Sequence, residues 1–124
     1  MTLDLSERER SYLESQRLGR LATVAADGQP QNNPVGFFLN DEVGVVDIGG
    51  QAMGKTKKFR NVGANPLVSF VVDDLASVKP WRVRGVEIRG RAEAITDWTR
   101  PFPYYSHEAI RIHPERVISW GLAD

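Results

Sequence analysis

Val83-Arg84-Gly85-Val86-Glu87-Ile88-Arg89-Gly90-Arg91-Ala92-Glu93-Ala94-Ile95 is the segment from which the architecture of this chain follows. Apolar and charged residues alternate along most of it, which is the period of a β-strand with one buried face. Glycines stand at two positions inside the segment, 85 and 90. Glycine inside a long strand marks a bend, and a small closed sheet needs such bends to turn its corners. The segment therefore predicts a long, bent barrel strand.

The flanking sequence supplies the other strands of the predicted barrel. Tight-turn residues separate apolar or alternating runs, as in Ala26-Asp27-Gly28-Gln29 and Asn40-Asp41. Together with residues 83–95, the predicted strands are 18–25, 30–39, 43–48, 67–73 and 109–120, the last interrupted by Pro114. Short helices are expected from Ser6, which forms a capping box with Glu9, to about residue 17, and over residues 56–62. The prediction is a mainly β, six-stranded antiparallel split barrel with short helices, as a single domain over residues 1–124.

Composition excludes several classes of function. The chain has 124 residues, with 16 acidic and 16 basic side chains, so no overall charge favours nucleic acid. It has no cysteine and only two histidines, so we expect neither disulfides nor a metal site. The N-terminal residues are polar, and no apolar run approaches the roughly 20 residues of a membrane span. We expect a cytoplasmic protein that binds neither a membrane nor nucleic acid.

A cluster of cations follows the strand 43–48 and a glycine-rich turn. Lys55, Lys57, Lys58 and Arg60 lie at the start of the predicted helix 56–62, which Gly63 and Pro66 are expected to end. The first N–H groups of a helix have no partners within it and attract anions, and lysine adds full positive charge. The segment predicts a site for the phosphate of a nucleotide-like cofactor. The alternative is a solvated helix face without a ligand.

The same segment also matches the pattern of a nucleotide-triphosphate loop. Residues 49–56 read Gly-Gly-Gln-Ala-Met-Gly-Lys-Thr, which satisfies Gly-x-x-x-x-Gly-Lys-Ser/Thr. Such a loop opens a long helix in a parallel α/β unit. Here the helix is predicted to last under two turns between antiparallel strands. The sequence context therefore opposes this interpretation.

Eight blocks of sequence, in order along most of the chain, resemble one known family. They are 18–24 (Leu-Gly-Arg-Leu-Ala-Thr-Val), 27–30 (Asp-Gly-Gln-Pro), 34–37 (Pro-Val-Gly-Phe), 57–62 (Lys-Lys-Phe-Arg-Asn-Val), 65–74 (Asn-Pro-Leu-Val-Ser-Phe-Val-Val-Asp-Asp), 80–81 (Pro-Trp), 84–90 (Arg-Gly-Val-Glu-Ile-Arg-Gly) and 112–120 (Ile-His-Pro-Glu-Arg-Val-Ile-Ser-Trp). The chain resembles the flavin- and deazaflavin-binding split β-barrel proteins related to pyridoxamine 5′-phosphate oxidase. Within that family it is most similar to small members that use the deazaflavin coenzyme F420.

The resemblance implies a cofactor site. In the family a Ser/Thr-Arg/Lys-Lys triplet holds the cofactor phosphate, and the matching residues are Thr56-Lys57-Lys58, with Lys55 beside them. The flavin ring lies along two strands, and glycines allow it to approach the backbone. The matching ring-site residues are Asn33, Pro34, Val35, Gly36, Asp47, Ile48 and Gly49. The family also implies a homodimer whose partner subunit completes the pocket, with Trp81, Arg84 and Trp120 as candidates to reach it from either chain.

The implied activity is hydride transfer from a deazaflavin to a small conjugated substrate. In this class the cofactor performs the chemistry, so the catalytic residues and the proton donor stay unassigned. Lys55 and Arg60 match the acidic tail of coenzyme F420 by charge. Asn33 stands where vitamin B6 oxidases often carry arginine, which opposes vitamin B6 chemistry. Two alternatives remain open: an FMN-dependent oxidoreductase on the same fold, and a flavin- or deazaflavin-binding carrier without catalysis.

Overall fold

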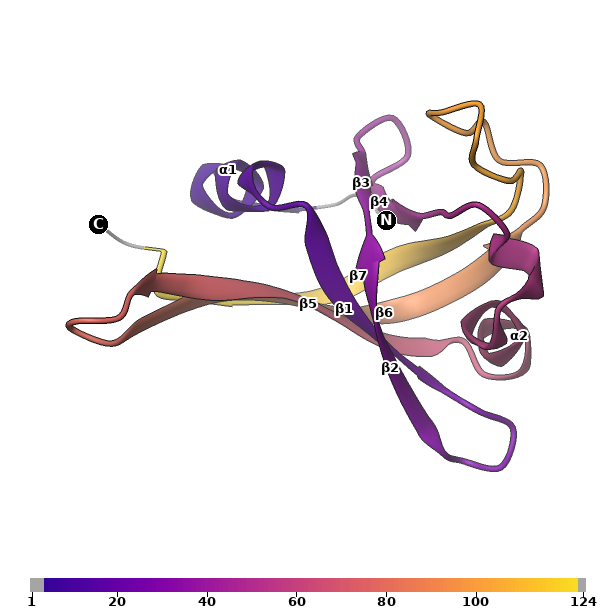
Figure 1. The fold of residues 1–124 in the computed structure, drawn as a ribbon, viewed down its shortest axis with the longest axis horizontal. Helices are drawn as coiled ribbons and strands as arrows, with labels where there is room; N and C mark the ends of the chain where they lie inside the picture. Colours follow the sequence, from indigo (N-terminus) through magenta and orange to yellow (C-terminus); the bar gives the residue numbers. More distant parts are fainter. Residues whose placement is uncertain (1–3, 123–124) are drawn as a thin grey trace.

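The fold is a single curled, fully antiparallel sheet with two short helices (Figure 1). The computed structural model describes residues 4–122, and within them the sheet has seven strands in the order β2-β1-β5-β6-β7-β4-β3. The strands are β1 (Leu18–Val24), β2 (Pro30–Gly36), β3 (Phe38–Asn40), β4 (Val45–Ile48), β5 (Leu67–Ser77), β6 (Arg82–Ile95) and β7 (Ala109–Trp120). The helices are α1 (Glu7–Ser15), the 3₁₀ turn η1 (Met53–Lys55) and α2 (Lys57–Ala64). The split-barrel prediction is confirmed.

Several strand boundaries differ from the prediction; β5, for example, continues to Ser77 where the predicted strand ended at residue 73. The expected strand 30–39 is divided at Phe37 into β2 and β3, which accounts for seven strands rather than six. Val43 lies in the turn before β4, because Gly44 adopts a positive φ of 69° that only glycine tolerates easily. The strand 109–120 is continuous at Pro114, where an interruption was predicted.

Pro114 is accommodated by a β-bulge between the two longest strands. Gly90 pairs with Pro114, but the preceding Arg89 pairs with Arg116, so Glu115 has no opposite residue. A bulge leaves one residue unpaired and increases the local bend, which is how a strand keeps its ladder around a proline. A Cβ on Gly90 would lie 2.1 Å from the carbonyl oxygen of His113. The sheet can bend here only because residue 90 has no side chain.

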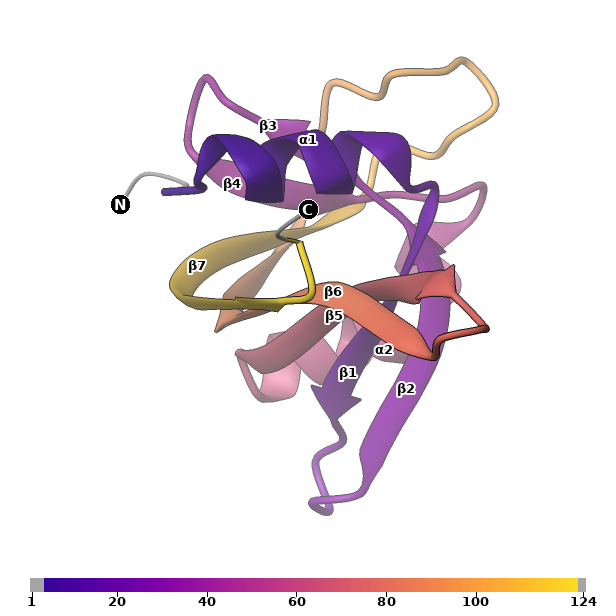
Figure 2. The same cartoon turned by 90° about the vertical axis from the view of Figure 1, so that its left-hand side faces the viewer.

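The core lies inside the curl of the sheet and is closed by α1. Phe70, Val72, Val86, Ile88 and Ile110 are fully buried along the three central strands. The predicted capping box at the start of α1 is confirmed: Ser6 accepts from the Glu9 N–H, and the Glu9 carboxylate accepts from the Ser6 N–H. Helix α1 lies along one side of the sheet (Figure 2). Its residues Tyr12 and Leu13 are buried in the core. Figure 1 shows the β5–β6 hairpin reaching out at one end and α2 at the other.

A matched pair of glycine variants tests this account of the bend. Gly90→Ala should lower the free energy of unfolding by about 1–3 kcal/mol, since its Cβ meets backbone that cannot move without breaking the ladder. Gly63→Ala is the control, because nothing lies within 4 Å of its Cβ position and it stands inside α2. There alanine should stabilise by about 0.5–1 kcal/mol. Urea unfolding of both variants measures the two effects; equal effects would contradict the role assigned to Gly90.

Candidate functional site

The start of α2 presents unsatisfied backbone donors. Thr56 is its N-cap: the Thr56 hydroxyl accepts from the Phe59 N–H at 3.3 Å and donates to the Met53 carbonyl at 2.7 Å. The N–H groups of Lys57 and Lys58 come before the first intrahelical bond and have no partner within residues 4–122. The Thr56 hydroxyl thus has a local structural role that differs from the phosphate contact predicted for it. It shapes the helix end that carries the free donors.

Four cations surround this helix end without being neutralised. Lys55, Lys57 and Arg60 are exposed, and Lys58 is half-buried. Within the described part of the chain, no carboxylate forms an ion pair with any of them. One carboxylate does approach from the side, where Glu108 Oε1 accepts from the Gly54 N–H at 3.2 Å. The helix dipole and the four side chains therefore give one patch of positive potential, which suits an anion.

A buried amide links α2 to β2, the predicted ring-binding strand. Asn61, which is 5 % exposed, donates to the Thr23 hydroxyl at 3.0 Å and to Gln31 Oε1 at 2.8 Å. Gln31 in turn donates to Asn33 Oδ1 at 2.9 Å. This chain of bonds fixes the cationic helix against β2, so two parts of the predicted site are brought together. The sequence does not indicate the pairing of Asn61 with Gln31, because partners 30 residues apart leave no local pattern.

β2 is an edge strand, and this matters for what can bind along it. It pairs with β1 on one side and ends the strand order of the sheet on the other. Of the predicted residues on it, Val35 belongs to the core, whereas Asn33 and Gly36 are half-buried and Pro34 is exposed. The Cβ position of Gly36 meets only the Tyr105 hydroxyl, at 3.8 Å. The strand offers open backbone groups and an approachable glycine, as a planar ring would need.

The predicted residues on β4 are used differently from the expectation. Ile48 is fully buried in the core, and the Asp47 carboxylate is 2 % exposed and bound within the protein. The Cβ position of Gly49 lies 2.3 Å from the Trp98 ring. Gly49 therefore makes room for an indole of this chain. Approach of a cofactor ring to this glycine stays a prediction.

An aromatic loop, residues 96–108, borders the site. The loop between β6 and β7 returns to the glycine-rich turn, where the Ser106 hydroxyl accepts from the Met53 N–H at 3.1 Å and the Ser106 N–H donates to the Gly50 carbonyl at 2.8 Å. Arg100 orders the loop by donating to the carbonyls of Pro103 and Tyr105. The cationic helix end, β2 and this loop thus surround one region.

Trp81 and Arg84 lie outside that region within one chain. They stand at the tip of the β5–β6 hairpin, and α2 joins the sheet near Ala92, where the Ala92 N–H donates to the Pro66 carbonyl. Arg84 and Ala92 are separated by roughly 26 Å of extended strand. Trp120, the third candidate, packs over Gly85, whose Cβ position is 2.6 Å from the Trp120 ring. The site predicted from sequence is therefore not assembled by a single chain.

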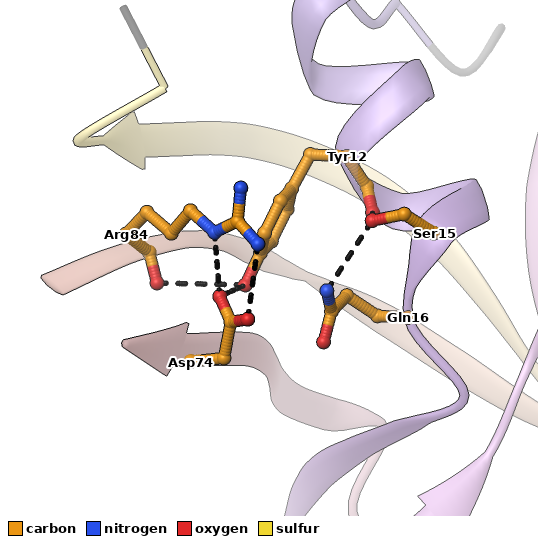
Figure 3. A network of polar contacts seen from close by, with 5 residues as sticks. All are labelled: Tyr12, Ser15, Gln16, Asp74 and Arg84. Atoms are coloured by element: carbon orange, nitrogen blue, oxygen red, sulfur yellow. Dashed lines mark hydrogen bonds and ion pairs between the residues drawn. The ribbon is translucent and has the colours of Figure 1, made fainter. Parts of the chain in front are cut away.

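Arg84 instead forms a polar network beneath α1 (Figure 3). Its guanidinium donates to both carboxylate oxygens of Asp74, at 2.7 and 3.1 Å, and the Tyr12 hydroxyl donates to the same carboxylate at 2.9 Å. The Arg84 bonds lower the pKa of Asp74, whereas burial and the bond to Asp74 raise that of Tyr12. The network lines a cleft of about 700 Å³ between α1 and the hairpin. It ties the part of the hairpin near its turn to α1.

Comparison with known proteins places the chain in a family. The family model for pyridoxamine 5′-phosphate oxidase matches residues 5–121. The chain belongs to the pyridoxamine 5′-phosphate oxidase family. It is 45 % identical over 121 residues to the 5a,11a-dehydrotetracycline/5a,11a-dehydrooxytetracycline reductase of Streptomyces rimosus, with 97 % of this chain and 85 % of the relative covered.

Two solved structures extend the comparison. A protein described as an F420 reductase is 28 % identical with a TM-score of 0.68, covering 92 % of this chain and 98 % of its own. A FAD-binding protein from Mesorhizobium loti is 27 % identical with a TM-score of 0.65, and 93 % of each chain is covered. Because the chain belongs to this family and is 45 % identical to a reductase, it is an oxidoreductase. Residues 4–122 contain no helix long and apolar enough to cross a membrane.

Proposed function

We propose that this protein is a deazaflavin-dependent reductase that uses coenzyme F420 to transfer hydride to a small conjugated substrate. The observation that carries the proposal is the unneutralised cationic start of α2, held by Asn61 beside the open edge of β2. A cofactor with a phosphate and a planar ring needs both features, the cationic helix end for the phosphate and the open strand edge for the ring. The similarity to a dehydrotetracycline reductase and to an F420 reductase supports the choice of reaction and cofactor.

The residues present fit this cofactor. The free N–H groups and the ammonium groups of Lys57 and Lys58 would hold the phosphate by charge-assisted hydrogen bonds. Lys55 and Arg60 are exposed on the same patch and would attract the acidic tail. Asn33 and Gly36 would position the ring against β2. When bound, the reduced deazaflavin supplies the hydride; the protein supplies position, charge and exclusion of water.

We further propose a homodimer whose second subunit completes the site. The hairpin tip carries exposed apolar side chains: Trp81 is 67 % exposed and Val78 is 61 % exposed, with Leu75 and Val83 each 41 % exposed. Such a group of exposed large apolar residues is typical of an interaction surface. Because Trp81 and Arg84 lie far from α2 in their own chain, they would reach a cofactor only by crossing to the partner. The hairpin is the element of the right shape to do so (Figure 1).

A fluorescence titration with coenzyme F420, run in parallel with FMN, tests the cofactor assignment. We expect micromolar or tighter binding of the deazaflavin and weaker binding of FMN. Coenzyme F420 has an acidic tail that Lys55 and Arg60 can bind, whereas FMN has no such tail. Preference for FMN would favour the flavin-dependent alternative, which the FAD-binding neighbour supports. Binding without turnover of enones, quinones or tetrapyrroles would favour the carrier. Binding of neither cofactor would overturn the proposal.

A further inference from the structure

An aromatic surface stands beside the proposed cofactor site. Phe38 on β3 lies with its ring centre 6.0 Å from Trp98, 6.2 Å from Phe102 and 6.0 Å from Tyr105. Phe102 and Tyr104 stack on each other at 5.2 Å with an interplanar angle of 9°. Trp98 is buried, but Phe102 is 40 % exposed and Tyr104 is 59 % exposed. Two stacked aromatic side chains are thus partly exposed on a loop that is fixed to the rest of the protein.

The loop is anchored, so this surface is preorganised. The Trp98 N–H donates to the His107 carbonyl at 2.9 Å, which closes the base of the loop, and the Trp98 indole donates to Asp47 at 3.1 Å. Arg100 donates to the carbonyls of Pro103 and Tyr105 at 3.0 and 2.7 Å. A surface that is already ordered loses little entropy when a ligand binds to it.

Two adjoining clefts lie against the buried edge of this aromatic group. One, of about 320 Å³, is lined by Phe38, Trp98 and Pro101, and the other, of about 360 Å³, by Trp98, Thr99 and Arg111. They share Asn40, Glu42, Trp98 and Thr99, so they are neighbours on one surface. Their volumes lie near the lower end of the roughly 300–1,000 Å³ range of small-molecule sites, which are mostly apolar with a few placed polar groups.

The clefts carry an excess of negative charge. Asp41 pairs with Arg10 at 2.6 Å, and Asp47 pairs with Arg111 at 2.8 Å. Glu42 and Asp97 also line the clefts, both are exposed, and neither forms an ion pair with any residue the structure describes. The aromatic surface therefore has cations on one side, at the start of α2, and unneutralised carboxylates on the other.

We propose that this aromatic surface binds the substrate, and that the substrate is a planar fused-ring molecule bearing a protonated amine. The inference rests on the proposed function, since it assigns the substrate side of the same site. The rings of Phe102 and Tyr104 stack on the fused rings, and Glu42 and Asp97 attract the ammonium group. Aromatic rings and carboxylates together favour an organic cation, because the ring faces also carry negative potential. An anionic substrate is excluded from the clefts by the same charges.

Calorimetric titration with two probes tests the proposal, on the protein alone and with saturating coenzyme F420. The probes are 9-aminoacridine, a three-ring cation, and acridine, which has the same rings and is uncharged at neutral pH. We expect both to bind, with 9-aminoacridine about tenfold tighter, a difference of about 1.4 kcal/mol. That preference should shrink as salt is added, because exposed charges are screened. Equal affinities for the two probes, or no binding of either, would overturn the proposal.

Variants separate stacking from charge. The double variant Glu42→Gln with Asp97→Asn should bring the affinity for 9-aminoacridine down to that for acridine. Glu14→Gln removes an exposed carboxylate on α1 and should leave the preference unchanged. Phe102→Ala with Tyr104→Ala should lower the affinity for both probes, whereas Tyr104→Phe should leave both affinities unchanged. A preference that survives the carboxylate variant would refute the charge assignment.

The cofactor titration distinguishes failure of this inference from failure of the proposed function. Coenzyme F420 affinity depends on the start of α2 and should not change in the Glu42/Asp97 variant. Binding of coenzyme F420 without the 9-aminoacridine preference would overturn only the substrate inference. A preference for 9-aminoacridine without binding of coenzyme F420 would overturn the cofactor assignment and leave an aromatic site for organic cations.

Discussion

Replacing Lys57 and Lys58 together by glutamate should abolish measurable binding of coenzyme F420, weakening it about a hundredfold or more. Each substitution turns an attraction to the phosphate into a repulsion, and one unit-charge contact at 4 Å amounts to about 1 kcal/mol even in water. The fold should be retained, because Lys57 is exposed, Lys58 is half-buried and neither forms an ion pair within residues 4–122. Glutamate in the first turn also favours the helix dipole. Fluorescence titration and thermal unfolding measure the two effects.

Two further variants make this experiment specific. Lys57→Arg with Lys58→Arg keeps both charges and should keep binding within a few-fold. Lys79→Glu reverses an exposed charge on the β5–β6 turn, at the other end of the sheet from α2. Because the partner's hairpin is proposed to complete the site, this variant should weaken binding of coenzyme F420. Unchanged affinity would mean that the hairpin lies away from the cofactor. Unchanged affinity in the Lys57/Lys58 glutamate variant would contradict the phosphate site itself.

The architecture could be predicted because its signals are local. Alternation along 83–95, tight-turn residues and the Ser6/Glu9 capping box each specify a conformation within a few residues. Boundaries were wrong where a local rule met a compensating contact. Gly63 did not end α2, which continues to Ala64 before Pro66, and Pro114 did not break β7, because Gly90 opposite it allows a bulge. A rule for proline or glycine alone cannot include the residue across the sheet.

The site was predicted in part, for the same reason. Its cations are contiguous in sequence, so their charge could be recognised directly. Its supporting contacts are not contiguous: Asn61 reaches Gln31, Ser106 reaches the Met53 N–H, and Trp98 covers Gly49. These pairs meet only once the sheet has curled. Gly49 illustrates the difficulty, since a glycine that must admit a ring does not reveal whether the ring belongs to a cofactor or to the protein.

The second large effect is expected at Asp47, the buried carboxylate beneath the aromatic loop. Its oxygens accept from the Arg111 guanidinium at 2.8 and 3.1 Å, from the Asn40 amide at 2.9 Å and from the Trp98 indole at 3.1 Å. Asp47→Ala would leave Arg111 partly buried without its partner and Trp98 without its acceptor. Breaking a buried ion pair in this way costs about 3–5 kcal/mol. Urea unfolding should show this loss, and exposure of Trp98 should shift its fluorescence.

Two comparisons identify the cause of that loss. Asp47→Asn keeps the shape and part of the hydrogen bonding, so it should lose less stability than Asp47→Ala. Asp47→Ala with Arg111→Leu removes both charges and should recover part of the loss, because the uncompensated guanidinium is then gone. If the double variant were no more stable than Asp47→Ala, packing of the loop would outweigh the ion pair.

Acid should reproduce part of the effect of removing Asp47. Burial alone would raise the pKa of this carboxyl, but the bonds from Arg111, Asn40 and Trp98 outweigh burial and lower the pKa below its ordinary value of 3.8. A lowered pKa in the folded state means that the carboxylate contributes stability above pH 3.8, and that this contribution is lost as pH falls through the folded-state value. The native protein should therefore lose more stability than Asp47→Asn in this acidic range. If stability fell equally steeply with pH in the two proteins below pH 3.8, the acid-sensitive group would not be Asp47. The carboxyls of Asp74 and Glu87, whose pKa values are also lowered, would be the next to test.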